Sequence, residues 1–287
     1  MLSVVVPCRD RPALLEGCLD ALESAISQGA EVIVVDSASA GADVANVAAA
    51  HDARVLRAGW PGTSRARNLG TRAAQGDAIA FVDDDVRVEP GWAAALLRCL
   101  DEHPDVAFVT GRITVPEHQR DAHRPVAVAD DSAPREFSGA DVSVLGHGAN
   151  LAVRRQAFDA VGGFDENFGP GARFRAAEDH DLFDRLLGAG FSGRYEPAFA
   201  AEHEQWRQRW TLVGLEWAYG FGTGARLARL RTTSPSLATT VAVSSLWTDG
   251  LRTIPASIRD GHEFNVAFVA ARVAATAAGF AAALLRP

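Results

Sequence analysis

The stretch Ile79-Ala80-Phe81-Val82-Asp83-Asp84-Asp85 places three consecutive carboxylates at the end of a short apolar run. Such a run is typical of a buried strand, in which residues two apart point to the same side. Asp83 and Asp85 would then converge on one point, where two hard oxygen ligands suit Mg²⁺ or Mn²⁺. An isolated run of Asp is more often a polar loop that caps the next segment, so a metal site here needs support from the rest of the chain.

Three other strand-like runs precede this one, and helical patterns separate them. The runs are Ser3 to Val6, which Pro7 ends, Glu31 to Val35, and Ala53 to Arg57. One helix begins at Pro12, and another is capped by Thr63 or Ser64 and runs to about Ala74. This alternation predicts an α/β sheet with helices on its faces.

Acidic residues follow two of these strands directly. Asp36 comes after the second strand and Asp83 after the fourth. In open α/β sheets, ligands bind in the crevice outside the carboxyl ends of the strands. The agreement between the two positions therefore indicates a ligand site at this edge.

The middle of the chain continues the same pattern around one long polar segment. We expect strands at 106–115, 142–145, 150–153 and 194–200, and helices at 92–100, 156–161 and from Glu178 onward. Glu117 to Ser138 is rich in polar residues, Pro and His and shows no periodicity. Its length favours a lid or a substrate-binding loop.

The character of the chain changes near Trp206. Aromatic and apolar residues recur there at helical spacing, namely Trp206, Trp210, Val213, Trp217 and Phe221. Such a stripe is more often core packing, and a membrane or lipid-linked acceptor surface is the alternative. We therefore predict a catalytic domain over residues 1–204 and a helical extension over 205–287.

Two Ala-rich helices are expected in this extension, over 236–247 and 264–285. The second is long enough to span a bilayer, but it contains Asn265 and Arg272. We expect an interfacial helix or one packed on the catalytic domain, and with it peripheral contact with a membrane.

Charge and cysteine content limit the function classes. The formal charge of −8 excludes broad nucleic-acid binding, and the absence of lysine leaves phosphate contacts to Arg and His. Three cysteines without a CxxC motif favour reduced thiols. Met1 leads directly into a strand without a secretion signal, so we expect a cytoplasmic protein, at the inner face of the cell membrane if the extension binds lipid.

A second acidic cluster, Glu178-Asp179-His180-Asp181, opens a predicted helix. Capping and the helix dipole explain one acid at such a position, but not three. A carboxylate that faces a cleft from a helix start can accept a proton from a hydroxyl. Asp179 is the candidate for this role.

Taken in order, several stretches of the chain resemble a family 2 glycosyltransferase with the GT-A fold. They are Val4 to Arg11, Val32 to Asp36, Ser64 to Gly70, Gly76 to Asp85, Asn150 to Arg155, Gly162 to Glu166, and Glu178-Asp179. Their order and spacing extend from Leu2 to about His203. The tail around 219–223 is similar to that of actinobacterial members.

The resemblance implies a nucleoside diphosphate sugar as donor and a hydroxyl acceptor on a glycan, a lipid-linked molecule, a peptide or a small molecule. Pro7 to Arg9 match the loop beside the base, and Asp36 matches the acid that bonds the base. Arg67 and Asn68 match helix residues near the nucleotide.

Further matches concern the metal, the base and the acceptor. Asp83 and Asp85 match the outer acids of the DxD motif that binds metal and ribose, and Asp84 between them leaves open which carboxylate is the direct ligand. In several members a histidine at the position of His203 completes the metal shell. Asp179 matches the general base. The residues expected in the acceptor or sugar region are Asn150, Glu178 and Asp181.

The implied reaction is a single displacement with inversion. A divalent cation stabilises the leaving diphosphate, and a carboxylate accepts the proton of the attacking hydroxyl. A sugar-1-phosphate nucleotidyltransferase would have a Gly-rich loop after the first strand and would typically bind phosphates with lysine. The chain has neither that loop nor any lysine. A non-catalytic nucleotide-sugar or glycan-binding module stays open, although the metal and base acids are present.

Overall fold

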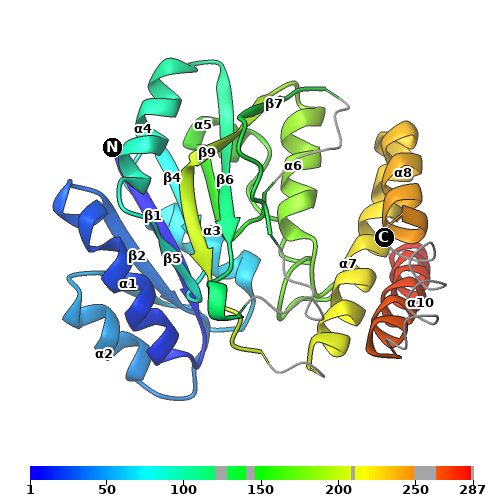
Figure 1. Cartoon of the computed structure of the whole chain (residues 1–287), viewed down its shortest axis with the longest axis horizontal. Coiled ribbons are helices and arrows are strands. Elements are labelled where there is room, and N and C mark those ends of the chain that lie inside the picture. The colour runs from blue at the N-terminus through cyan, green and yellow to red at the C-terminus, as the bar shows by residue number, and fades with distance from the viewer. Residues whose placement is uncertain (120–127, 140–145, 208–210, 249–262, 286–287) are drawn as a thin grey trace.

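The chain folds around one nine-stranded sheet (Figure 1), in a computed structural model that describes residues 1–119, 128–139, 146–207, 211–248 and 263–285. The strands are β1 (Leu2–Cys8), β2 (Glu31–Asp36), β3 (Arg54–Arg57), β4 (Ala78–Val82), β5 (Val86–Val88), β6 (Val106–Thr114), β7 (Arg135–Phe137), β8 (Asn150–Arg154) and β9 (Ser192–His203). Their order is β3-β2-β1-β4-β8-β6-β9-β5, and β7 pairs with β9.

The sheet is mixed and mainly parallel. β1, β2, β3 and β4 pair in parallel, and β6 pairs in parallel with β9. β8 lies antiparallel between β4 and β6, so these two strands run in the same direction. The carboxyl ends of the parallel strands therefore share one edge of the sheet, as predicted.

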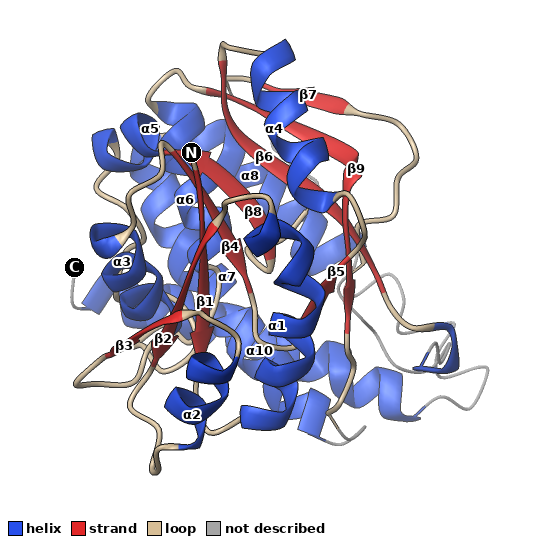
Figure 2. Ribbon diagram, turned by 90° about the vertical axis from the view of Figure 1, so that its left-hand side faces the viewer, coloured by secondary structure: helices blue, strands red, loops and turns tan. Residues whose placement is uncertain are grey.

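Helices cover both faces of the sheet (Figure 2). α1 (Pro12–Ser27), α2 (Asp43–Ala50) and α4 (Trp92–Glu102) pack on one face, against the side of β1 that carries Val4 and Val6. α3 (Thr63–Ala73), α5 (Arg155–Ala160) and α6 (Glu178–Gly188) pack on the other, against Val5. Adjacent residues of one strand serve different layers because side chains alternate across a sheet. The predicted α/β class with flanking helices is confirmed.

Several local predictions were wrong. β1 does not end at Pro7 but runs to Cys8. Val5 is the last residue of β1 that pairs with β4, and Pro7 lies beyond it, so the missing N–H of Pro7 costs little. Gly62, rather than Thr63 or Ser64, is the N-cap of α3, and the hydroxyl of Ser64 instead donates to the carbonyl oxygen of Phe168.

Other differences concern whole elements. α2 and β5 were not predicted, and the predicted lid contains the 3₁₀ turn Glu117–Gln119 and β7. The strand expected at 142–145 and the residue Trp210 lie outside the described residues.

The C-terminal extension is a set of helices beside α6, at the right of Figure 1. It comprises α7 (Thr211–Thr233), α8 (Pro235–Ala242), the π-helical turn Val243–Thr248 and α10 (Glu263–Leu285). α7 and α10 approach so closely that a Cβ at Gly224 would lie 2.0 Å from the carbonyl oxygen of Thr276. Ion pairs tie α7 to α6 and to the segment before it, since Arg226 binds Asp184 and Arg229 binds both Asp165 and Asp181.

One helix in the described part of the chain could cross a membrane by length and composition. The segment Val266–Leu285 of α10 has a mean hydropathy of 1.8, and 22% of it is buried inside the protein. Core helices pass the same test, so composition alone does not assign the helix to a bilayer.

Candidate active site

The three consecutive acids do not continue β4 as an extended chain. The N–H of Val86 donates to the carbonyl oxygen of Asp83 at 3.1 Å, so the acids lie in a turn. Strand alternation therefore does not set how Asp83 and Asp85 are placed relative to one another. Each of the three carboxylates has its own partners.

Asp84 is the inward-facing member of this turn. Its side chain is fully buried, and Nη2 of Arg11 lies 2.6 Å from its Oδ1, as an ion pair without hydrogen-bond geometry. Burial raises the pKa of Asp84 to about 7, although the charge of Arg11 acts to lower it. A carboxylate in this position supports the turn and is not accessible to a ligand.

Asp85 is buried among hydrogen-bond donors. Its Oδ1 lies 3.3 Å from Nε2 of His203, while its Oδ2 accepts from Nη1 of Arg11 at 3.3 Å and from Nε1 of Trp206 at 2.9 Å. Burial acts to raise the pKa of Asp85, but His203 and then Arg11 and Trp206 outweigh it and hold the pKa well below its usual range. The pKa of His203 is raised by Asp85, against the effect of burial.

Asp85 and His203 fit the donor set that a divalent cation requires. Adjacent ligands of an octahedral ion, each about 2.1 Å from it, lie about 3 Å apart. The 3.3 Å between Oδ1 of Asp85 and Nε2 of His203 matches this spacing. No group of three His, Cys, Asp or Glu side chains is preformed among the described residues. The remaining ligands of an ion here would be water and a diphosphate, as is usual for Mg²⁺.

The second acidic cluster begins α6 and reaches the same edge of the sheet. Oδ2 of Asp179 accepts from the N–H of Gly148 at 2.9 Å, and its Oδ1 lies 2.9 Å from Nδ1 of His180. Burial acts to raise the pKa of Asp179, but the charge of His180 and these hydrogen bonds hold it well below the usual range. Burial, with the charge of Asp179, raises the pKa of Glu178 to about 7. Two adjacent carboxyls thus differ in protonation near neutral pH.

Arg67 on α3 connects the two acidic clusters. Its Nη2 donates to Oδ1 of Asp83 at 2.7 Å, and its Nη1 donates to Oε1 of Glu178 at 3.1 Å. Acids that lie 95 positions apart in the sequence (178 − 83 = 95) therefore meet on one guanidinium. Asp83 keeps a partly open side chain, 28% exposed, as a group that contacts a ligand would need.

The residues predicted around the base lie along the same edge. Asp36 is the last residue of β2 and is 1% exposed, with Oδ1 accepting from the N–H of Ser39 and Oδ2 accepting from Nη1 of Arg57 at 2.6 Å. Pro7 is buried at the end of β1, and Nε of Arg9 lies 3.4 Å from Oδ2 of Asp10. A base that bonds Asp36 would therefore have to displace Arg57 or share Asp36 with it.

Three predicted site residues hold the protein together instead. The amide of Asn150 is 0% exposed and bonds Trp92 Nε1 and the carbonyl oxygens of Arg112 and Phe199. Asn68 pairs with the backbone of Phe164 in both directions. Asp181 is 1% exposed between Arg185 and Arg229. The contacts that the structure shows for these three side chains are thus contacts within the protein.

Sequence reasoning missed the roles of Arg11 and Trp206 at this edge. Arg11 stood within a matched stretch but received no role, and Trp206 was assigned to a helical stripe. In the structure Trp206 precedes α7, and its ring is 45% exposed, with the Arg11 and Arg207 guanidinium carbons 5.5 and 4.5 Å from its centroid. Only the turn after β9 brings it to Asp85.

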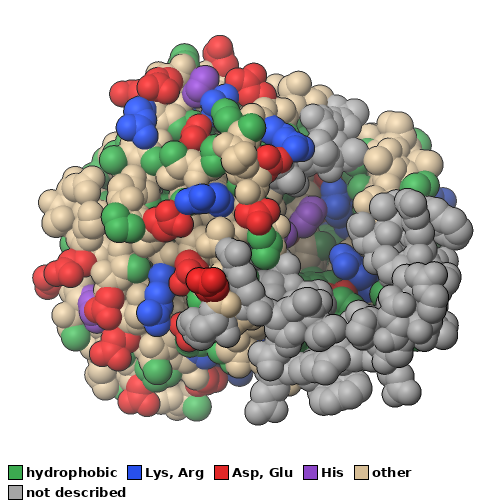
Figure 3. Space-filling view, in the orientation of Figure 1, with side chains coloured by type: hydrophobic (Ala, Val, Ile, Leu, Met, Phe, Trp, Pro, Cys, Tyr) green, Lys and Arg blue, Asp and Glu red, His purple; other side chains and the backbone are tan. Residues whose placement is uncertain are grey.

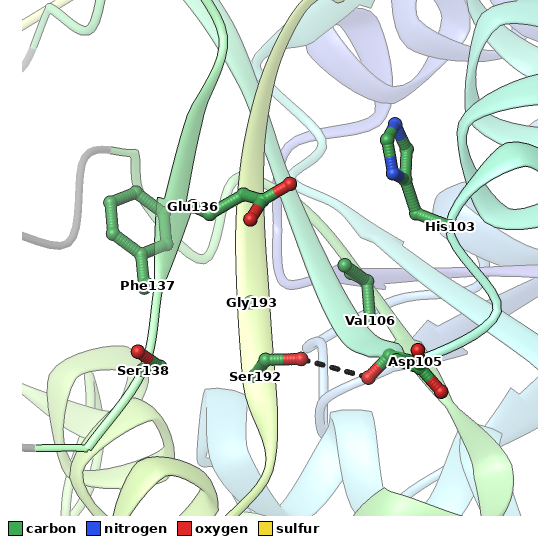
Figure 4. Close-up of a pocket in the computed structure, with 8 residues that line it drawn as sticks. All are labelled: His103, Asp105, Val106, Glu136, Phe137, Ser138, Ser192 and Gly193. Atoms are coloured by element: carbon green, nitrogen blue, oxygen red, sulfur yellow. Dashed lines mark hydrogen bonds between the residues drawn. The ribbon is translucent and has the colours of Figure 1, made fainter.

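A partly open pocket lies at the opposite edge of the sheet (Figure 4). Its volume is about 190 Å³, and its lining includes His103, Asp105, Glu136 and Ser192 near the amino ends of β6 and β9. The hydroxyl of Ser192 donates to the carbonyl oxygen of Asp105 there. The acids described above follow carboxyl ends, so this pocket is separate from them. The surface is also hollowed between the sheet domain and the C-terminal helices, where histidine and arginine side chains are visible (Figure 3).

Comparison with known sequences agrees with the family resemblance described above. The family model for glycosyl transferase family 2 matches residues 3–162. The pre-mycofactocin glycosyltransferase of Mycobacterium tuberculosis is 33% identical over 235 residues, which cover 79% of this chain and 47% of that protein. The chain thus spans about half the length of that curated relative.

Solved structures share the fold at lower identity. The mannosyltransferase PcManGT from Pyrobaculum calidifontis, in complex with GDP-Man and Mn²⁺, aligns with a TM-score of 0.62 and 16% identity, over 97% of this chain and 86% of that one. Residues 1–349 of S. aureus TarS, in complex with UDP-GlcNAc, align with a TM-score of 0.58 and 14% identity, over 99% and 91% of the two chains. These likenesses establish a GT-A type fold.

Proposed function

The chain belongs to glycosyltransferase family 2, and from this premise we propose that it is an inverting enzyme that moves a sugar from a nucleoside diphosphate to an acceptor hydroxyl by single displacement. The observation that carries the proposal is the double contact of Arg67 with Asp83 and Glu178. It joins the acid that follows β4 to the acids that open α6. A donor bound at the first group and an acceptor activated at the second would then meet in one site.

Asp85 and His203 are the residues that would hold a divalent cation. When bound, the cation supplies stabilisation of the negative charge on the leaving diphosphate. Arg11 contacts the same carboxylate of Asp85 and adds positive charge beside it. The charge complement of the site suits a diphosphate even in a chain without lysine.

Asp179 is proposed as the general base. Its lowered pKa keeps the carboxylate ionised at neutral pH, and Gly148 and His180 fix its orientation. It would accept the proton of the acceptor hydroxyl as the oxygen attacks the anomeric carbon. Attack from the face opposite the diphosphate inverts the anomeric configuration. Burial raises the pKa of Glu178 beside it to about 7, and Glu178 supports the site through Arg67.

For the donor we propose a nucleoside diphosphate sugar, with its base near Asp36 and the loop from Pro7 to Arg9. The two similar solved structures are complexes with GDP-Man and with UDP-GlcNAc, which makes both base types worth testing. We further propose that residues 1–204 form the catalytic part and that residues 205–287 bring the enzyme into peripheral contact with the cytoplasmic face of a membrane.

The test is a panel of UDP-, GDP- and TDP-sugars with Mn²⁺ or Mg²⁺, scored for donor hydrolysis and for transfer to glycan and lipid-linked acceptors. We expect turnover with at least one donor, a loss of 100-fold or more in Asp179→Asn and in Asp85→Ala, and little change in the exposed control Asp159→Asn. Nucleotide binding without turnover across the panel, or full activity in both site variants, would contradict the proposal.

A further inference from the structure

We propose that Arg67 is a positioning residue, which holds the two acidic clusters of the site in one geometry instead of binding the nucleotide as its place in the sequence suggested. The inference rests on the proposed function, because the acids it aligns are those of the transfer reaction.

The guanidinium of Arg67 is closed off from solvent. Its side chain is 1% exposed, and its Cζ lies 5.2 Å from the centroid of the Phe164 ring. A residue that binds a nucleotide phosphate has to present N–H groups to the cleft. Nη1 and Nη2 of Arg67 donate to protein oxygens, and its buried Nε has no hydrogen-bond partner among the described residues.

The terminal nitrogens of Arg67 reach three separate segments of the chain. Nη2 donates to Oδ1 of Asp83 and, at 3.3 Å, to the carbonyl oxygen of Gly148. Nη1 donates to Oε1 of Glu178. The N–H of Gly148 in turn donates to Asp179, so the predicted base is connected to Arg67 through a single residue.

The space around Gly148 admits a side chain only if its neighbours shift. A Cβ there would lie 3.2 Å from Nη1 of Arg67 and 3.1 Å from Cβ of Asp179. Both distances are shorter than ordinary van der Waals contact. Arg67, Gly148 and Asp179 are therefore packed as one unit, and a shift of any of them displaces the others.

The chemistry of arginine explains why this residue type stands here. The planar guanidinium presents donors in a fixed fork and can bind two acids from different segments at once, whereas the lysine ammonium is a compact point charge on a flexible stem. Burial acts to lower the pKa of Arg67, but Asp83 and Glu178 raise it, so it stays a cation. Its charge offsets the repulsion between acids that would otherwise separate.

The test compares Arg67→Lys, which keeps the charge, with Arg155→Lys as the matched control. Arg155 also makes three hydrogen bonds, but to the backbone carbonyls of Gly76, Thr71 and Ala74. We expect Arg67→Lys to lower kcat by 100-fold or more, because misplacement by about 1 Å has this effect. The Kd of UDP or GDP with MnCl₂, measured by calorimetry, should change by less than about tenfold. Arg155→Lys should leave kcat within about threefold.

A fall in nucleotide affinity that matches the fall in kcat/KM, with kcat unchanged, would identify Arg67 as a nucleotide ligand and overturn the proposal. Wild-type kcat in Arg67→Lys would overturn it as well. If Arg67→Lys does not fold, Glu178→Ala carries the same test, since it removes the acceptor of Nη1 and should lower kcat at least tenfold with nucleotide affinity retained.

Hydrogen–deuterium exchange separates this proposal from the proposed function. Arg67→Lys should speed exchange of the Gly148 and Asp179–His180 amides, and Arg155→Lys should not. If the wild type turns over no donor, the proposed function fails, and the exchange result alone decides whether Arg67 holds these segments. Unchanged exchange in Arg67→Lys would show that it does not.

Discussion

The indole N–H of Trp206 donates a hydrogen bond to Oδ2 of Asp85 across 2.9 Å. The two residues are 121 positions apart, and they meet because the N–H of Glu204 bonds the carbonyl oxygen of Asp85 at 2.8 Å, which fixes the turn after β9. The segment that leads into the extension is thus anchored on the carboxylate proposed to hold a metal. Trp206 is 45% exposed, so this anchor lies at the protein surface.

Trp206→Phe should strengthen Mn²⁺ binding in the absence of nucleotide. The hydrogen bond lowers the electron density available on Asp85, and a bond to a charged group is worth about 1.5 kcal/mol, or roughly tenfold in affinity. Titration of free Mn²⁺ by electron paramagnetic resonance measures the change. Trp217→Phe, a change at a partly exposed tryptophan of α7, is the control. Weaker binding in Trp206→Phe would mean that the indole supports the metal-bound form instead.

Gly148→Ala should impair the chemical step more than binding or folding. The added methyl group would press on Asp179 and Arg67, each of which must shift by a few tenths of an ångström. We expect kcat to fall by roughly 10- to 100-fold with little change in nucleotide Kd. Gly188→Ala, at the end of α6 where a Cβ meets nothing within 4 Å, should behave as wild type. Equal activity of Gly148→Ala and Gly188→Ala would show that Asp179 and Arg67 make room for the added methyl group without loss of function.

Glu216 should make the protein less stable as pH rises. Burial raises the pKa of Glu216 from 4.5 to about 7, although Arg272 acts to lower it. Between these values the folded state holds a proton that the unfolded state has lost, so the free energy of unfolding falls through this window and stays low above it. In Glu216→Gln the loss between pH 5 and pH 8 should shrink by up to about 3 kcal/mol.

Urea unfolding at several pH values measures the slope of the free energy of unfolding against pH. Glu23→Gln, on the exposed side of α1, is the matched control and should leave the slope unchanged. The pKa values of Asp84 and Glu178 are also raised, but both residues are present in all three proteins. Their contribution to the pH dependence therefore cancels in the comparison. Identical slopes in Glu216→Gln and wild type would mean that Glu216 is hydrated in the folded state.

The end of α10 should determine membrane attachment. Leu284 and Leu285 are 46% and 82% exposed at the end of its apolar segment. Replacing both with Glu should reduce sedimentation with anionic liposomes at least threefold, because charge is costly to insert and is repelled by anionic lipid. Leu97→Glu, at a 44% exposed position on α4, should sediment as wild type. Sedimentation of the double variant at the wild-type level would exclude α10 as the contact.

The strand pattern and the acid placement could be predicted from the sequence because both follow from local rules. Apolar runs such as Ile79 to Val82 are strands in any context that buries them, and parallel strands bring Asp36 and Asp83 to one edge. The helix that starts at Glu178 was recognisable from its acids and its apolar periodicity. The family resemblance rested on these same stretches, and the family model confirms it.

The partners of each acid could not be predicted, because they come from distant segments. Residue spacing does not predict that Arg67 points inward and bonds Glu178. Nor does it predict that Asn150 and Asp181 bond other groups of the protein. Trp206 shows the same limit. Its spacing from Trp217 suggested one helical stripe, but Trp206 lies before α7 and Trp217 lies within it.

Local chemistry along the chain thus determined the α/β class, the edge that carries the acids and the family. Tertiary structure decided which of these acids are open to a ligand, which are neutralised by arginine, and which are structural. The physical reason is that the charge state and accessibility of a buried carboxyl depend on what surrounds it, and those surroundings are assembled only when the chain folds.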